Sequence, residues 1–505
     1  MKNKAALSIA ILGVASIMNY IITFFLTPYI SENIGVDAYG FVSIAKTFVS
    51  YGEIVTVALT SFVVRYISVY YHKGDITEAR SYYVSAIKAS CYLAILMLCV
   101  FAIVIVQLHN ILNIPQNLVN SVKSLFAWMV FAFLMTLLST PFSVCFYIKN
   151  RLDIYGTIKI MSYIVEILVL IVLFAFFETK LWYVGSATAV AAFVILAGSY
   201  CVNHRMVPEL KYSGKLFSAS KVITLLKNGI WNSLNQLGNT LNSGLDLLVS
   251  NALLSGNETG EIAIAKNIGA IFAAVAAIIF QPLQPGLLRE YSKGESEGFY
   301  KKLKGDMVIC GFFGSLLFAG FFALGYHFYT MWLPNQNTEE LYILTVITVF
   351  SYIMDIFLQP LYYVNTLTLK NKIPCFVTIT GGILNVIGMY FLIRFMKLGM
   401  YAVPVTTAFI MFIINVGFNP IYASWCLKLK KAYFYPVIVR YLLATFIMCV
   451  VFTFAAKVFH PLTWESFAVS VSVMCFLGIG IYYMIMQGYE KSFEIIKSIM
   501  RFNKK

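Results

Sequence analysis

The sequence predicts an all-α integral membrane protein with about fourteen transmembrane helices. We expect two pseudo-symmetric six-helix lobes around a central cavity, plus two C-terminal helices. Apolar residues make up 60% of the 505 residues and charged residues 12%, about half the charged share of soluble domains. The apolar residues form blocks of about 18 or more, long enough to cross a hydrocarbon layer of roughly 30 Å as helices. An internal repeat predicts the arrangement of these helices in two lobes.

The first apolar block follows Met1-Lys2-Asn3-Lys4 and superficially resembles a signal peptide. It continues to Ile30, which is longer than the apolar core of a signal peptide, and a second block follows within a few residues. We therefore expect it to remain as the first helix. The fourteen expected helices cover approximately residues 7–30, 39–67, 83–108, 121–148, 156–178, 182–203, 228–254, 259–288, 305–330, 341–366, 374–396, 401–427, 434–457 and 466–488.

Basic residues predict the orientation. With the N-terminus in the cytoplasm, 30 of the 37 lysines and arginines fall at the cytoplasmic ends of helices or in the connections there, as is usual for membrane proteins. Both termini are then cytoplasmic, and the net charge of +15 reflects topology rather than nucleic-acid binding. The seven basic residues found elsewhere are Lys46, Lys123, Lys180, Lys266, Arg394, Lys397 and Lys457.

An internal repeat relates the first part of the chain to the second by one constant offset. Gly40-Phe-Val-Ser-Ile-Ala-Lys46 aligns with Gly260-Glu-Ile-Ala-Ile-Ala-Lys266, and Asn19 aligns with Asn239. This offset spans six helices, an even number, so the two halves have the same orientation and a substrate is expected between them. The predicted lobes are residues 1–204 and 205–427, followed by helices thirteen and fourteen and a cytoplasmic tail in residues 428–505.

Several segments resemble the polysaccharide exporter branch of the multidrug/oligosaccharidyl-lipid/polysaccharide (MOP) superfamily. The chain departs from that branch at Ala58-Leu59-Thr60, where many members carry Asp-x-Gly. The resemblance implies a fold like that of multidrug and toxic compound extrusion (MATE) transporters, and a flippase for lipid-linked oligosaccharides. Composition and periodicity alone imply only a transporter. The segments that carry the resemblance are Ile34-Gly-Val-Asp-Ala-Tyr-Gly40, Arg65, Lys73-Gly-Asp75, Glu78-Ala-Arg80, Asp246 and the stretch from Gly260 to Arg289.

Lys46 and Lys266 are the most informative charges inside the predicted spans. The repeat places them at matching depth in opposite lobes, about two turns from the outer ends of their helices. Ionisable residues there are costly and mark functional sites, and two ammonium groups would suit an anionic headgroup such as a polyprenyl pyrophosphate. Alternatively each lysine extends outward or is neutralised, Lys46 by Glu53 seven residues away on the same helix face, and Lys266 by Asp246 at similar depth.

The predicted spans also contain carboxylates and a polar stripe. Glu53 could carry a coupling proton instead of neutralising Lys46, and Glu166 and Asp355, at mid-span, suit either proton coupling or a structural hydrogen bond. The stripe recurs at intervals of 4, 3, 4, 3 and 4 residues on the seventh helix and must face protein or water. It would form helix–helix hydrogen bonds or line a cavity for sugars, as would Ser16, Asn19 and Thr23 in the first lobe. Its members are Asn228, Asn232, Asn235, Asn239, Asn242 and Asp246.

Motifs of catalysis and metal binding are absent from the sequence. The five histidines lie near predicted helix ends, no zinc-protease, Walker A or nucleophile-elbow motif appears, and the nine cysteines form no Cys-x-x-Cys pair. We expect neither an enzyme nor a cofactor. A membrane-embedded glycan polymerase or ligase would need a larger outer loop than residues 109–120.

The favoured hypothesis is a flippase of the bacterial cytoplasmic membrane. It would carry undecaprenyl-pyrophosphate-linked repeat units of O-antigen lipopolysaccharide or capsule to the outer leaflet by alternating access. The lipid tail would stay in the bilayer, along a groove built by helices thirteen and fourteen. Partners would be the lipid-linked oligosaccharide, membrane lipids and glycan-assembly proteins such as a polysaccharide polymerase, with no nucleic acid. The alternative is a multidrug or cation antiporter of the MATE type, which should prefer an anionic cavity.

Overall fold

The computed structural model confirms the predicted fold class. It describes residues 2–292, 296–368 and 370–486, except the side chains of residues 2–10, 231, 235, 239, 242, 243 and 296. Within these ranges the chain is helical and forms no strand. Thirteen of the described helical segments are long and apolar enough to cross a membrane. The expected seventh span, residues 228–254, is the polar one, and it is split into α9 and α10.

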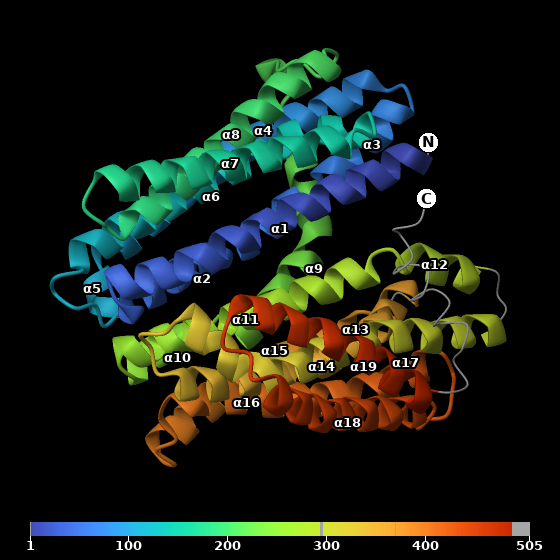
Figure 1. Cartoon of the computed structure of the whole chain (residues 1–505). Coiled ribbons are helices and arrows are strands. Elements are labelled where there is room, and N and C mark those ends of the chain that lie inside the picture. The colour runs from blue at the N-terminus through green and yellow to red at the C-terminus, as the bar shows by residue number, and fades with distance from the viewer. Residues whose placement is uncertain (1, 293–295, 369, 487–505) are drawn as a thin grey trace. The chain divides into compact units, whose positions relative to one another are not determined.

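The chain forms two compact units, residues Met1–Gly260 and Glu261–Lys505. In the first unit, long helices run side by side, with α6 packed against α8 and α1 against α7 (Figure 1). The second predicted span is interrupted at Ser61 and Phe62, which separate α2 from α3. The helices of this unit are α1 (Lys2–Asn33), α2 (Val36–Thr60), α3 (Val63–His72), α4 (Ile76–Val106), α5 (Leu108–Ile111), α6 (Val119–Ile148), α7 (Leu152–Phe176), α8 (Trp182–Met206), η1 (Gly214–Leu216), α9 (Ala219–Ser243) and α10 (Asp246–Leu253).

The second unit is built around α13 and α14, which pack on each other, with α18 against α13. Pro282 lies between the helices α11 and α12, where the chain leaves helical geometry, because proline has no N–H to continue a helix. The predicted twelfth span contains a π-helical turn, η3. The helices are α11 (Gly256–Phe280, which begins in the first unit), α12 (Gln284–Ser292), α13 (Ser296–Trp332), α14 (Thr338–Leu367), α15 (Lys372–Arg394), η2 (Gly399–Tyr401), α16 (Ala402–Phe412), η3 (Ile413–Phe418), α17 (Asn419–Cys426), α18 (Tyr435–Phe459) and α19 (Trp464–Ile485).

Helix bounds recur at the offset that the sequence predicts for the repeat. The recurrence extends from the second helix of the repeat to the end of the sixth, so both halves use one six-helix plan. The two compact units, which meet at Gly260, are defined by packing and not by the repeat. The predicted lobe limits 1–204, 205–427 and 428–505 therefore stay a prediction. Equivalent bounds are Val36 and Gly256, Thr60 and Phe280, His72 and Ser292, Ile76 and Ser296, Leu152 and Lys372, and Met206 and Cys426.

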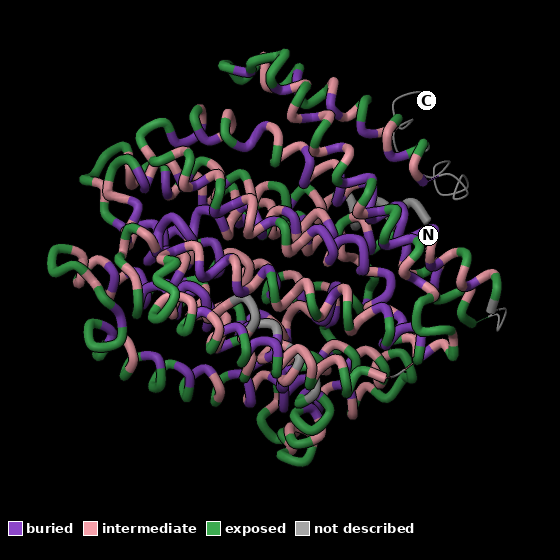
Figure 2. Tube along the Cα trace, turned by 90° about the horizontal axis from the view of Figure 1, so that it is seen from below, coloured by how far each residue is buried: buried purple, intermediate pink, exposed green. Residues whose placement is uncertain are grey.

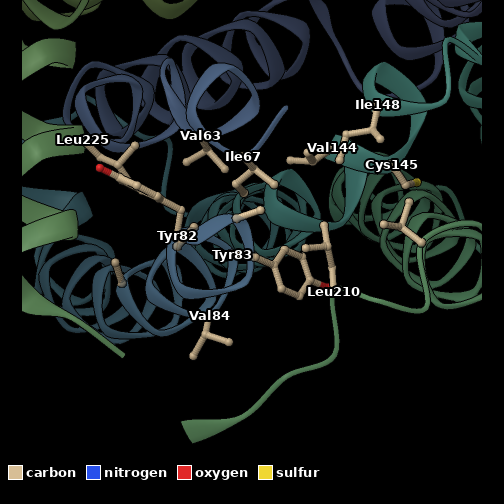
Figure 3. Packing of buried hydrophobic residues seen from close by; sticks show 14 of the residues in the cluster. Val63, Ile67, Tyr82, Tyr83, Val84, Val144, Cys145, Ile148, Leu210 and Leu225 are labelled. Atoms are coloured by element: carbon tan, nitrogen blue, oxygen red, sulfur yellow. The ribbon is translucent and has the colours of Figure 1, made fainter. Parts of the chain in front are cut away.

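The core of the first unit lies where α3, α4 and α6 meet. Val63, Ile67, Tyr83 and Val144 are almost completely buried there (Figure 3). Burying such side chains stabilises a fold through close packing, because lipid tails are as apolar as the side chains themselves. Along each helix, buried positions recur between exposed ones, and the connections are largely exposed (Figure 2).

Glycines allow α2 to pack closely against its neighbours in the first unit. A Cβ added to Gly229 on α9 would overlap the carbonyl oxygen of Ala58, and one added to Gly260 would overlap that of Val36. Between these points the Ser233 hydroxyl donates a hydrogen bond to a backbone carbonyl of α2. Small residues at such contacts are typical of membrane helices that approach each other backbone to backbone. α9 is therefore held firmly on α2.

Candidate functional site

The main candidate site is a cluster on three helices of the first unit. Lys46 of α2 has an exposed side chain, although Ile44 and Ala45 before it are buried. Glu166 of α7 is only 9% exposed. Its carboxylate accepts a hydrogen bond of 2.9 Å from the Thr188 hydroxyl on α8 and attracts the Lys46 ammonium. An accessible cation therefore lies near a carboxylate that a third helix holds in place.

The position of Glu166 follows from the pattern of α7. Its buried residues are Gly156, Ser162, Glu166 and Leu170, which recur at intervals of six, four and four and so lie along one side of the helix. α7 packs against α1 and α8, and this narrow side faces them. The carboxylate is thus directed into the protein, while most of the other residues of α7 are half-buried or exposed.

Glu53, the carboxylate that sequence spacing placed beside Lys46, is exposed on α2. The attraction at Lys46 comes from Glu166, which the sequence identified only as a mid-span carboxylate. Spacing along one helix finds neighbours on that helix, whereas this partner is on α7, and only the packing of α2 and α7 in one unit brings them together. The roles proposed for Glu53 stay predictions.

Polar groups of α1 and α7 extend the cluster. Asn19 is exposed on α1, and its backbone carbonyl accepts a hydrogen bond of 3.2 Å from the Thr23 hydroxyl. Next to it on α1, Tyr20 lies within electrostatic reach of Tyr163 on α7, which also faces Glu166. The hydroxyls of these two tyrosines are donors, so the cluster combines an ammonium group with neutral donors that could bind an anionic or sugar-bearing headgroup.

Asp246 and Lys266 lie in different units. Asp246 begins α10 and is buried, with Tyr51 of α2 within electrostatic reach. The Tyr51 hydroxyl donates a hydrogen bond of 2.9 Å to the carbonyl of Gly244, which lies between α9 and α10. Lys266 is half-buried on α11, at the place in the repeat that corresponds to Lys46. The pairing of Asp246 with Lys266 stays a prediction.

The asparagine stripe lies on α9, as the sequence predicts for its helix. Asn228 and Asn232 are exposed, and the Asn228 amide donates hydrogen bonds to the Tyr66 hydroxyl, at 2.9 Å, and to the carbonyl of Thr224, at 2.8 Å. The N-terminal end of the stripe is therefore both accessible and tied to α3. The side chains of the remaining asparagines, Asn235, Asn239 and Asn242, lie outside the described residues.

Asp355 belongs to a polar network in the second unit. Its carboxylate accepts a hydrogen bond of 3.2 Å from the Gln359 amide and interacts with the Tyr362 hydroxyl. That hydroxyl donates a hydrogen bond of 2.9 Å to the Asn415 amide oxygen, to which the Asn419 amide donates at 3.0 Å. Asn415 is part of η3, and π-helical turns occur often at functional sites. This network could hold a proton or a small cation.

Sequence analysis identified Asp355 but missed its partners. Asp355, Gln359 and Tyr362 are separated by four and three residues, the same spacing that revealed the asparagine stripe. This spacing of polar residues, if sought in every predicted span, would have identified all three side chains as members of one helix face. Asn415 and Asn419 are four apart, but only tertiary structure joins them to α14.

No protein family model matches the chain. It is 28% identical to EpsK of Bacillus subtilis (strain 168), described as an uncharacterized membrane protein, over 421 residues, which cover 83% of each chain.

Solved structures match over more of the chain. The lipid II flippase MurJ, in an inward closed conformation, has a TM-score of 0.67 at 14% identity and covers 97% of this chain and 99% of its own. An inward-facing multidrug resistance transporter of the MATE family, in the MOP superfamily, also has a TM-score of 0.67, at 12% identity, and covers 84% of this chain and 99% of its own. The protein therefore has the helical membrane fold that MurJ shares with MATE transporters of the MOP superfamily.

Proposed function

We propose that the protein is a flippase for undecaprenyl-pyrophosphate-linked oligosaccharides. It would carry these repeat units from the cytoplasmic to the outer leaflet of the bacterial cytoplasmic membrane, for polysaccharides of the cell surface such as capsule or O-antigen. Both termini would be cytoplasmic. A polysaccharide polymerase, or another protein of glycan assembly, would receive the product.

Lys46 is the observation that carries this proposal. An ammonium group within a membrane-spanning helix is costly, and such residues mark pathways for ions or substrates. Glu166 attracts this ammonium while its own position is set by Thr188. The attraction favours the charged form of Lys46, and the accessible side of this lysine would bind a pyrophosphate. Charge-assisted hydrogen bonds to phosphate are about twice as strong as neutral ones.

The extent of the structural matches favours a lipid substrate. The MurJ match covers 97% of the chain, and the MATE match leaves 16% uncovered, which corresponds to about 80 residues. Residues 428–505, the predicted addition to the six-helix repeat, have nearly that length. The match to the lipid flippase thus extends further along the chain than the match to the multidrug transporter, and a lipid-linked substrate needs surface for its tail.

Transport would proceed by alternating access between the two repeats, as in other transporters built from parallel repeats. The cluster of Lys46, Tyr163 and Asn19 would bind the headgroup, and the asparagine stripe of α9 would accept the sugars. Glu166 and Asp355 would balance charge or take up the coupling ion. The MATE-type antiporter remains the second candidate, because these two carboxylates in the spans would also suit a cationic substrate.

Substitution of Lys46 tests the proposal. Glycan delivery to the cell surface would be measured in a host that lacks its own flippase, with protein amounts determined by immunoblot. Lys46→Arg should keep delivery, because charge is retained, whereas Lys46→Gln should lose most of it. Removing one charge-assisted contact costs about 1.5–3 kcal/mol, or roughly 10- to 150-fold in affinity.

Lys180→Gln is the matched control, because Lys180 is a half-exposed lysine in the connection between α7 and α8. It should deliver glycan as the unchanged protein does. Wild-type delivery by a well-inserted Lys46→Gln protein would rule out a cationic headgroup site. Efflux of a cationic dye that depends on Glu166 or Asp355, without glycan delivery, would favour the antiporter.

A further inference from the structure

A long apolar groove lies between α1 and α7 in the first unit. Its volume is about 570 Å³. Both helices are long and apolar enough to span the membrane, and Phe25 and Ile171 in the groove are 67% and 58% exposed. A hydrocarbon chain entering from the bilayer would fit such an apolar, accessible surface. The lining residues are Ile21, Ile22, Phe25, Leu26, Tyr29, Ile167, Leu170, Ile171, Phe174 and Ala175.

One end of the groove meets the polar cluster around Lys46. Ile167, at this end, directly follows Glu166, and Ile21 directly follows Tyr20. Tyr20 and Tyr163 lie within electrostatic reach of each other there. At the other end the Tyr29 ring packs on Phe174, with centroids 4.6 Å apart, and the Tyr29 and Thr179 hydroxyls are 3.4 Å apart. The surface thus changes from charged to apolar along one path, as an amphiphile does.

The second repeat does not conserve all the apolar residues that line this groove. At the equivalent positions of the second repeat, Ile22 and Leu26 correspond to Asn242 and Asp246, and Phe174 corresponds to Arg394. The apolar path is therefore not a general consequence of packing two helices of this repeat. It is retained where the accessible lysine lies beside it.

We propose that this groove binds part of the isoprenoid tail of the transported lipid while its pyrophosphate is at Lys46. The inference rests on the proposed function and deepens it. From Ile21 to Tyr29 the groove extends about 12 Å along α1, less than half of a hydrocarbon layer of roughly 30 Å. In the predicted orientation it occupies the outer half of the membrane. It therefore guides the tail toward the outer leaflet.

Photo-crosslinking of the full-length protein in membrane vesicles tests this assignment. p-Benzoylphenylalanine would replace Ile171 in the groove or, as the matched control, Leu168. Leu168 lies on the same helix and is 54% exposed but does not line the groove. The probe is radiolabelled undecaprenyl pyrophosphate carrying a short oligosaccharide, and the competitors are unlabelled polyprenyl pyrophosphate and phosphatidylglycerol.

The expected result is labelling at position 171 that polyprenyl pyrophosphate suppresses and phosphatidylglycerol does not, with little labelling at 168. Equal labelling at both positions, or labelling that phosphatidylglycerol suppresses equally well, would assign the groove to bulk lipid and overturn the inference. No labelling at 171 in a variant that still delivers glycan would overturn it as well. In these cases delivery and its dependence on Lys46 would leave the proposed function standing.

Filling the groove gives an independent result. Ala175→Trp, which puts a large ring where a small exposed side chain lines the groove, should lower glycan delivery several-fold, because the ring takes the place of van der Waals contacts with the tail. Leu168→Trp should leave delivery within about twofold. Equal delivery by the two variants at equal protein amounts would contradict the groove. Loss of delivery in both variants, with normal insertion and with unchanged labelling at position 171 of the Ala175→Trp protein, would contradict it too.

Discussion

The two six-helix repeats link their fifth and sixth helices through side chains of different charge. In the first repeat the Glu166 carboxylate accepts a hydrogen bond from Thr188, 22 residues later. In the second repeat the Asn385 amide donates one of 3.1 Å to Thr407, again 22 residues later. Asn385 and Thr407 each lie one residue before the repeat position that is equivalent to Glu166 or Thr188. The same two helices are thus joined by an ionisable link in one half and a neutral link in the other.

The difference shows that the repeat preserves geometry more strictly than chemistry. Helix bounds recur at the repeat offset, whereas one carboxylate of the second half, Asp355, lies on α14 and contacts Tyr362. The first-half equivalents of these two residues are Met135 and Phe142. Helix lengths are set by the membrane, so they are shared. Buried charges are costly, so each half carries them only where a partner is present.

The largest effect should come from two glycines at equivalent places in the repeat. A Cβ on Gly260 would overlap the Val36 carbonyl oxygen, whereas a Cβ on Gly40 would lie 3.1 Å from the Gly260 backbone. Gly260→Ala must displace backbone, which costs about 1–3 kcal/mol or more; Gly40→Ala needs only a small shift. We expect Gly260→Ala to accumulate poorly and Gly40→Ala to accumulate nearly normally, as measured by fluorescence-detected gel filtration of tagged protein. Equal profiles would mean that the two contacts are equally tolerant.

Next in size is the asparagine stripe, which distinguishes α9 from α1. If the stripe lines a wet cavity, the double substitution Asn235→Leu and Asn239→Leu should abolish most glycan delivery and leave insertion intact. Val14→Leu and Ile17→Leu on α1, which keep apolar residues apolar and do not line the groove, serve as the control. Both proteins would be compared by delivery and by the amount in the membrane. Failure of the Asn235→Leu, Asn239→Leu protein to accumulate would instead identify the stripe as packing between helices.

Sequence alone predicted most of the fold, because hydrophobic blocks and the repeat are local or periodic signals. Thirteen of the fourteen expected spans correspond to described helical segments that are long and apolar enough to cross a membrane, and the polar seventh is present as α9 and α10. The sequence did not predict the break between α9 and α10 or the π-helical turn η3, since neither changes the hydrophobic period. At the site, Lys46 and Glu166 were found individually as charges in spans. Their juxtaposition and the Thr188 contact depend on packing, which no single helix records.

A smaller effect should separate the charged link from the neutral one. Thr188→Val removes a hydrogen bond to a carboxylate, worth about 1.5–3 kcal/mol, and Thr407→Val removes one between neutral groups, worth about 0.5–1.5 kcal/mol. The thermal transition of the purified protein in detergent should therefore fall more for Thr188→Val. Thr188→Ser, which keeps the hydroxyl, should restore most of the difference. A larger fall for Thr407→Val would show that the charge of Glu166 adds nothing to this link.

The smallest effect should come from making the second repeat resemble the first. Tyr362→Phe introduces the residue found at the equivalent Phe142 and removes only the phenolic hydroxyl between Asp355 and Asn415. The ring stays, so we expect a loss of about 0.5–1.5 kcal/mol in stability and nearly normal protein amounts. Glycan delivery should persist, because Lys46 and its groove are in the other unit. If Asp355 takes up the coupling ion, however, the dependence of delivery on external pH or sodium should change in Tyr362→Phe and not in Phe142→Tyr. An unchanged dependence would leave the network with a purely structural role.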